Sequence, residues 1–146
     1  MSVVETKGNP YAHVVLRGGG GKPNYDTVSI QICEEELSSA DLDSNIMVDC
    51  SHANSANPKT DKRDYKLQPL VLKNLTSQIV DGNKSIVGAM IESNLNAGSQ
   101  KILSNPNDME YGVSVTDGCI DWETTEASIL EMADKLRDVL KTRNEK

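Results

Sequence analysis

The stretch "IMVDCSHANS", residues 46–55, passes from a run of apolar residues into a small polar cluster that contains a histidine. A short β-branched run with little polar alternation is typical of a strand that is covered on both faces, as strands of parallel sheets are. The polar cluster marks the end of that strand. His52, one of two histidines in the chain, is therefore predicted to stand at the carboxyl end of a buried strand.

Three other runs have the same character, and segments with helical periodicity separate them. The predicted strands are residues 12–16, 46–50, 85–91 and 112–116. The predicted helices are residues 26–40, 67–80 and 123–143, and the Asn-, Gly- and Ser-rich residues 94–112 are predicted to form a long loop. This order predicts βα units in an α/β fold with about four parallel strands. Either a small doubly wound sheet or part of a (β/α)8 barrel fits the pattern.

The composition limits the class of protein. At 146 residues, one domain spanning residues 1–146 is expected. The formal net charge of −7 argues against a general nucleic-acid binder, and no stretch approaches the ~18 to 20 apolar residues of a membrane span. Cys33, Cys50 and Cys119 are odd in number and lack metal-type spacing, which predicts reduced thiols and a cytoplasmic location.

Each predicted strand is followed by a strongly polar residue: Arg17, His52, Glu92 and Asp117. Because active sites of α/β folds assemble at the carboxyl ends of the strands, we expect these side chains to share one rim. His, Glu and Asp form a ligand set for Mn²⁺, Fe²⁺ or Zn²⁺, and Arg suits a phosphate or carboxylate. The glycines of "RGGGGK", residues 17–22, have neither P-loop nor dinucleotide spacing, so a flexible turn is preferred there.

Four motifs carry a family resemblance: "LRGG" at 16–19, "DCSHANS" at 49–55, "ESNLNAGSQ" at 92–100 and "YGVSVTDGCIDWETTE" at 111–126. Together they resemble class I 3-deoxy-D-arabino-heptulosonate 7-phosphate (DAHP) synthase. The resemblance implies a transferase of the shikimate pathway to aromatic amino acids, which condenses phosphoenolpyruvate with erythrose 4-phosphate. It covers the carboxyl-terminal part of the family's chain, so the expected fold is the carboxyl-terminal half of a TIM barrel.

The resemblance also implies roles for the rim residues. His52, Glu92 and Asp117 match the family's metal ligands, and Arg17 matches an arginine that binds the phosphate of phosphoenolpyruvate. The expected cofactor is a divalent ion: Mn²⁺, Fe²⁺, Co²⁺ or Zn²⁺. The chain departs from the family at Gly20 and Gly21, where a basic residue is expected, and at Asp121, where Gly is expected.

The amino-terminal half of the family's chain has no counterpart in these residues. According to the resemblance, that half carries a cysteine metal ligand, further phosphoenolpyruvate contacts and the motif that receives the sugar phosphate. We therefore expect negligible synthase activity from this chain alone, and a need for the missing half, a second chain or a homo-oligomer to close the barrel. The alternatives are a non-catalytic half-barrel that binds or regulates a partner, and an inactive fragment.

Overall fold

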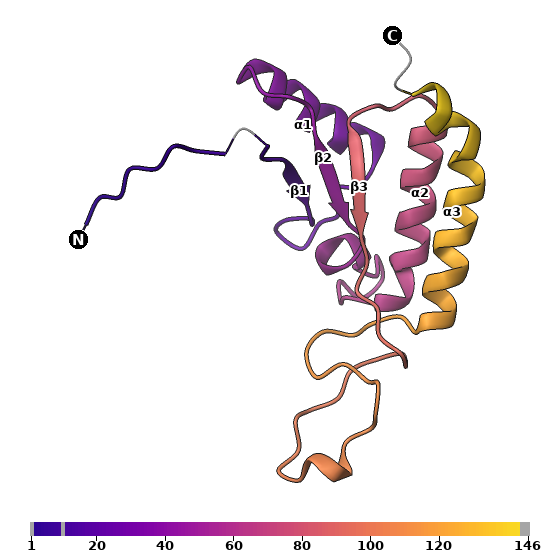
Figure 1. The fold of residues 1–146 in the computed structure, drawn as a ribbon. Helices are drawn as coiled ribbons and strands as arrows, with labels where there is room; N and C mark the ends of the chain where they lie inside the picture. Colours follow the sequence, from indigo (N-terminus) through magenta and orange to yellow (C-terminus); the bar gives the residue numbers. More distant parts are fainter. Residues whose placement is uncertain (1, 10, 144–146) are drawn as a thin grey trace.

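The computed structural model describes residues 2–9 and 11–143, and its centre is a parallel sheet (Figure 1). The strands are β1 (Val14–Leu16), β2 (Ile46–Asp49) and β3 (Ile86–Met90), in the order β1-β2-β3. Both neighbouring pairs are parallel, with Val14 opposite Ile46 and Ile46 opposite Ile86. The predicted α/β class with parallel strands is confirmed.

Within the described residues, three α-helices connect or follow the strands: α1 (Thr27–Ser39), α2 (Gln68–Val80) and α3 (Trp122–Thr142). Each lies within one residue of its predicted bounds. Short 3-10 helices η1 (His52–Ser55), η2 (Tyr65–Leu67) and η3 (Pro106–Asp108) lie in the connections. Helix α2 ends where Asp81 and Gly82 follow it, with Gly82 at a φ of +106°. No helix of residues 2–9 and 11–143 is long and apolar enough to cross a membrane.

The helices cover one face of the sheet. Ile46 and Val48 of β2 point into this core, where they meet Leu75 of α2 and Ile30 of α1, and all four are nearly inaccessible to solvent. Full burial of one such side chain contributes about 1.5 to 3 kcal/mol. Figure 1 shows α2 and α3 side by side, and Leu136 of α3 completes the core.

The opposite face of the sheet lies open within the described chain. Val15 of β1 is 40% exposed, and Val87 and Met90 of β3 are 52% and 42% exposed. The apolar residues on this face led to the prediction of a sheet covered on both sides. Only the helix side is covered by the described residues.

The predicted fourth strand at residues 112–116 is wrong, because three strands make up the described sheet. Ser114 pairs instead with Ser99 of the long loop, and its carbonyl accepts the amide of Gln100 at 2.8 Å. The chain that pairs beyond the end of β3 is at Ile120, which forms an isolated parallel bridge with Ser93. Alternating Val, Ser and Thr residues thus satisfy their backbone groups within the loop rather than in the sheet.

The predicted loop is confirmed, apart from the 3-10 turn η3 inside it. In Figure 1 the chain between β3 and α3 extends past the carboxyl ends of the strands and returns to them. This excursion brings Asp117, distant in sequence, to the edge of the sheet where β2 and β3 end.

Candidate metal centre

His52 begins the 3-10 helix η1, three residues after the end of β2. Its backbone has a φ of +55°, in the left-handed region that a residue with a Cβ rarely adopts. The neighbouring backbone is anchored, since the amide of Cys50 donates to the carbonyl of Met90 at 2.9 Å. The left-handed turn directs the imidazole across the carboxyl ends of β2 and β3.

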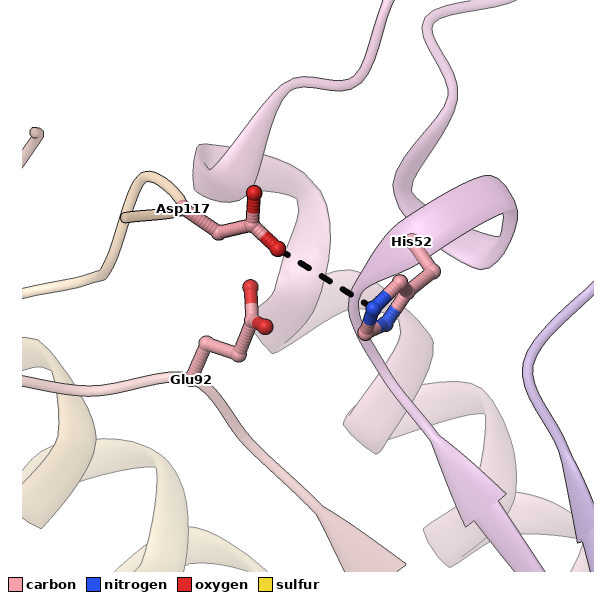
Figure 2. Close-up of side chains that lie close together, drawn as sticks. All are labelled: His52, Glu92 and Asp117. Atoms are coloured by element: carbon pink, nitrogen blue, oxygen red, sulfur yellow. Dashed lines mark ion pairs between the residues drawn. The ribbon is translucent and has the colours of Figure 1, made fainter.

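Three predicted ligands converge at this place. His52, Glu92 and Asp117 each offer a ligand atom, and these atoms lie within 4.8 Å of one another (Figure 2). His52 and Glu92 are partly buried, whereas the Asp117 side chain is 50% exposed. The convergence predicted from the strand ends is therefore present in the structure.

The imidazole of His52 faces a different carboxylate on each side. Nδ1 lies 2.8 Å from Oδ2 of the buried Asp49, and Nε2 lies 4.0 Å from Oδ2 of Asp117. The Nδ1–H is not aligned on the Asp49 oxygen as in a regular hydrogen bond, so the contact is chiefly electrostatic. A carboxylate beside Nδ1 favours the proton on that nitrogen and leaves the lone pair of Nε2 toward Asp117.

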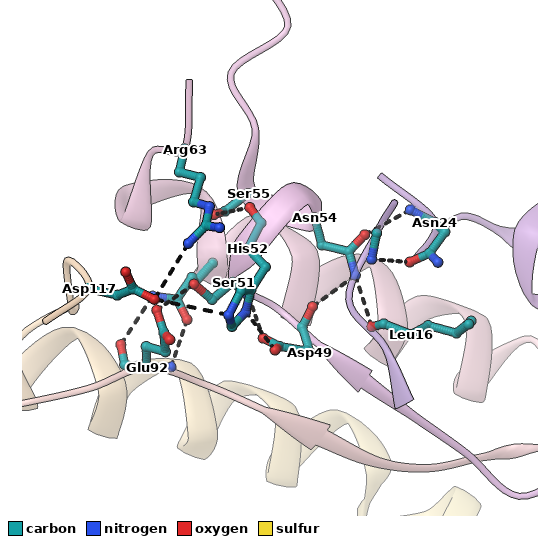
Figure 3. A network of polar contacts seen from close by, with 12 residues as sticks. Leu16, Asn24, Asp49, Ser51, His52, Asn54, Ser55, Arg63, Glu92 and Asp117 are labelled. Carbon is teal, nitrogen blue, oxygen red and sulfur yellow. Dashed lines mark hydrogen bonds and ion pairs between the residues drawn. The ribbon is translucent and has the colours of Figure 1, made fainter. Parts of the chain in front are cut away.

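Glu92 is held by its backbone and by its side chain (Figure 3). Its amide donates to Oε1 of Gln68 at 2.8 Å, and its carbonyl accepts from Nε2 of Gln68 at 3.0 Å. The hydroxyl of Ser51 donates to Oε2 of Glu92 at 2.6 Å. The hydrogen bond from Ser51 leaves Oε1 of Glu92 as the carboxylate oxygen without a partner in that network.

Arg63 approaches the third carboxylate. Its Nη1 lies 3.5 Å from Oδ2 of Asp117, and both side chains are about half exposed. Arg63 is a residue that the sequence reasoning did not single out. It lies in a polar loop after η1, where nothing in the local pattern distinguishes it from neighbouring lysines.

Arg17 is not part of the cluster formed by His52, Glu92 and Asp117. It is exposed, and its carbonyl accepts the amide of Ala53 at 3.2 Å, which ties the end of β1 to η1. Arg17, His52 and Arg63 all line one hollow of about 250 Å³, together with the glycine turn 18–21. His52 therefore belongs both to the cluster with Glu92 and Asp117 and to the hollow that Arg17 lines.

A family model described as the DAHP synthetase I family matches residues 1–129. The chain belongs to the DAHP synthetase I family. The resemblance inferred from the four motifs is confirmed by this match.

Named relatives agree with the family assignment. A Tyr-sensitive phospho-2-dehydro-3-deoxyheptonate aldolase of Salmonella typhimurium is 45% identical over 143 residues, covering 98% of this chain and 38% of the relative. A tyrosine-inhibited phospho-2-dehydro-3-deoxyheptonate aldolase of Candida albicans is 41% identical over 146 residues, covering 97% of this chain and 37% of the relative. The solved structure of a phospho-2-dehydro-3-deoxyheptonate aldolase from Francisella tularensis aligns with a TM-score of 0.77 at 40% identity. The alignment covers 95% of this chain and 37% of that structure's chain. The chain spans less than two fifths of each of these relatives.

In this DAHP synthetase I chain, Asn54 joins the strand ends to the loops around the site. Its Nδ2 donates to the carbonyls of Leu16 at 3.1 Å and Asp49 at 2.8 Å, and its Oδ1 accepts the amide of Asn24 at 2.7 Å. Asn24 in turn accepts the amide of Gly18 at 2.7 Å. Sequence reasoning missed this role of Asn54, because an amide is common in loops and only its contacts distinguish it.

The cysteines of this DAHP synthetase I chain are free and buried, as expected for reduced thiols. Burial, with the neighbouring Asp49 charge, raises the pKa of the Cys50 thiol to about 12. Burial also raises the pKa values of the Cys33 and Cys119 thiols. Cys50, two residues from His52, is not among the residues whose ligand atoms converge at the metal centre, which are His52, Glu92 and Asp117.

Proposed function

We propose that this chain supplies the divalent metal centre and one phosphate-binding arginine of a DAHP synthase. The observation that carries the proposal is the convergence of His52, Glu92 and Asp117 at the carboxyl ends of the strands. The family match and the relatives' names support the reaction class. The proposed substrates are phosphoenolpyruvate and erythrose 4-phosphate.

The donor set fits a divalent ion. One imidazole nitrogen and two carboxylates suit Mn²⁺, Fe²⁺, Co²⁺ or Zn²⁺, and the neighbouring Asp49 gives the histidine the carboxylate partner that metal-binding histidines usually have. Two ligand atoms bound at about 2.1 Å lie at most about 4.2 Å apart. The observed spread of 4.8 Å therefore requires only small side-chain rotations.

In the proposed reaction, C3 of phosphoenolpyruvate attacks the aldehyde carbon of erythrose 4-phosphate. Water adds at C2, and the C2–O bond to phosphate breaks to release inorganic phosphate. A bound divalent ion would supply Lewis-acid polarisation of the aldehyde. Arg17 would hold the phosphate of phosphoenolpyruvate, because its guanidinium donates in a fixed fork and stays charged. Holding the phosphate orients C3 for attack.

We propose that the sheet is the carboxyl-terminal half of a (β/α)8 barrel, as one domain spanning residues 1–146. The exposed side chains of Val15, Val87 and Met90 support this, because the inner face of a barrel is covered only when the remaining strands are present. We propose that this face is covered either by the remaining part of a DAHP synthase chain or by a second copy of this chain in a homo-oligomer. Free buried cysteines support a cytoplasmic location.

Calorimetric titration with Mn²⁺ tests the metal centre. We expect micromolar binding or tighter at one site, and His52→Ala is expected to abolish it. His13→Ala is the matched control, since His13 is the second histidine and lies before β1, opposite the ligand rim. Absence of binding by the unmodified chain, or equal loss in both variants, would contradict the proposed metal centre.

An assay of DAHP formation tests whether this chain carries only part of the active site. With Mn²⁺ and both substrates, the purified chain is expected to show negligible turnover, because most phosphoenolpyruvate contacts of the family are absent from it. Sedimentation of the same sample distinguishes a single chain from a closed homo-oligomer. Substantial turnover by a single chain would show that these residues form a complete site.

A further inference from the structure

We propose that Arg63 is an anion-binding residue that alternates between two partners: Asp117, when the metal centre is empty, and a phosphate group, when a divalent ion has taken Asp117. This inference rests on the proposed metal centre. It assigns to the loop after η1 a role that links metal binding to the binding of a phosphorylated substrate.

The backbone places Arg63 firmly although its side chain is exposed. Residues 56–63 form a closed loop in which Ala56 and Arg63 make an antiparallel bridge. The amide of Asn57 donates to the carbonyl of Lys62 at 2.8 Å, and the amide of Asp64 donates to the carbonyl of Ser55 at 2.9 Å. Both ends of the loop are thus tied to the end of η1, the 3-10 helix that begins with His52. Movement of the guanidinium requires side-chain rotation alone.

Arg63 and Arg17 line the same hollow, and this shared position points to an anion. The hollow holds about 250 Å³ and is also lined by the glycine turn 18–21 and by Asp61. The residues that line it therefore include two arginines and one aspartate, in a chain whose formal net charge is −7. Two arginines beside a space of this size suit a tetrahedral dianion such as phosphate, because each guanidinium can turn its fork of donors toward the anion.

The contact between Arg63 and Asp117 competes directly with metal binding. The contact uses Oδ2 of Asp117, the same oxygen that lies 4.0 Å from Nε2 of His52 (Figures 2 and 3). Oδ2 is the Asp117 oxygen that faces His52, so a divalent ion bound between these two side chains would take it from Arg63. The Arg63 pair is long, at 3.5 Å, and half exposed, so it is weak enough to be displaced.

Displacement by the ion changes what Arg63 binds. A cation that takes Asp117 neutralises the partner of Arg63 and repels the guanidinium, which leaves Arg63 to the hollow and to Arg17. The ion should therefore tighten anion binding through Arg63. Because coupling between two binding sites is reciprocal, an anion held by Arg63 should also tighten ion binding.

Calorimetry with Mn²⁺ and with inorganic sulfate tests the proposal, since sulfate is a tetrahedral dianion that keeps Mn²⁺ in solution. Arg63→Met removes the charge and keeps an unbranched stem. We expect it to bind sulfate about 10-fold more weakly and, without sulfate, to bind Mn²⁺ about 2- to 5-fold more tightly. Arg63→Lys should restore part of the sulfate affinity. Arg137→Met, on the exposed side of α3, is the control and should change neither affinity.

The coupling itself is measured by titrating sulfate with and without saturating Mn²⁺. In the unmodified chain we expect Mn²⁺ to tighten sulfate binding several-fold, and in Arg63→Met we expect that factor to shrink. Unchanged sulfate affinity in a folded Arg63→Met variant would overturn the proposal, as would an undiminished coupling factor. Failure of the unmodified chain to bind Mn²⁺ would instead overturn the proposed metal centre, while the sulfate titration without metal would still test Arg63.

Discussion

Gln68, at the start of α2 and fully buried, makes two hydrogen bonds to the backbone of Glu92, one through each atom of its amide group. The helix thereby fixes the position of a candidate metal ligand at the end of β3. The carbonyl of Glu92 also accepts the amide of Ile120 at 3.1 Å, but Gln68 is the partner of the Glu92 amide N–H. The Gln68 side chain therefore couples the packing of α2 to the geometry of the site.

We expect Gln68→Met to lower both stability and metal affinity. Methionine fills a similar volume but cannot pair with the Glu92 amide, and a buried unpaired group costs about 1 to 3 kcal/mol. Urea unfolding measures the first effect, and Mn²⁺ titration of the folded variant measures the second. The backbone of Glu92 should shift, so that Mn²⁺ binds more weakly.

Gln78→Met is the matched control for Gln68→Met. Gln78 is also buried in α2, and its Nε2 donates to the carbonyl of Tyr25 and to Oδ1 of Asn74, both at 2.8 Å. It lies at the other end of the helix from the site. The control should lose stability and keep its Mn²⁺ affinity. Equal Mn²⁺ affinities in the two variants would show that Gln68 supports the fold without positioning Glu92.

Asp49 is predicted to hold His52 in the orientation that binds metal. Its carboxylate is buried, accepts the amide of Ser51 at 2.8 Å and lies 2.8 Å from Nδ1 of His52. We expect Asp49→Asn to reduce Mn²⁺ affinity about 10-fold or more, because loss of a histidine's carboxylate partner typically has that effect. Calorimetric titration measures the change, with Asp43→Asn in the exposed loop before β2 as control. A folded Asp49→Asn variant with unchanged affinity would contradict this role.

Much of the fold was predictable from local patterns. The helices follow from regular apolar spacing and clear end signals, so their predicted bounds hold to one residue. The strand at 112–116 was mispredicted because Val113 and Val115 have the composition of a strand. Whether such a segment joins a sheet depends on which backbone groups reach it, and the pairing of Ser114 with Ser99 is a contact across the loop.

The site was predictable where strand ends supplied the residue. His52, Glu92 and Arg17 lie within three residues of the carboxyl end of a strand, so parallel strands alone bring them to one rim. Asp117 was predicted to follow a strand at 112–116 that is absent from the described sheet, and it reaches the rim through the loop instead. Arg63 and Gln68 carry no local signal, since their roles arise from contacts with residues 54 and 24 positions further along the chain.

Gly18 is predicted to be indispensable for the turn 18–21 that follows Arg17. Its φ is +77°, and a Cβ added there would lie 2.6 Å from Cβ of Ala53 and 2.7 Å from the carbonyl oxygen of Lys22. We expect Gly18→Ala to cost about 2 to 4 kcal/mol of stability from backbone strain and overpacking. Gly19→Ala is the control, because a Cβ at Gly19 meets nothing within 4 Å. Urea unfolding of both variants checks the difference, which should be absent if the turn 18–21 adapts freely.

Asp121, which stands where the family is expected to have Gly, is the N-cap of α3 and is predicted to make its stability depend on pH. Its side chain accepts the amide of Thr124 at 2.7 Å, and hydrogen bonds from Thr124 lower the pKa of the carboxyl below its ordinary value of 3.8. At pH values between the lowered pKa of the folded chain and the ordinary pKa of the unfolded chain, the unfolded chain binds more protons than the folded chain. The capping contribution to stability is therefore complete above about pH 4 and is lost as the pH falls through the lowered pKa.

The variant Asp121→Asn isolates this contribution, since asparagine caps a helix about as well as aspartate but does not titrate. We expect the difference in unfolding free energy between the unmodified chain and Asp121→Asn to be constant from pH 7 to 5. Below pH 4 the difference should move in favour of the variant. Asp134→Asn, in the middle of the same helix, controls for the loss of one carboxylate. A difference that stays constant down to pH 2.5 would mean that the protonated Asp121 caps α3 equally well.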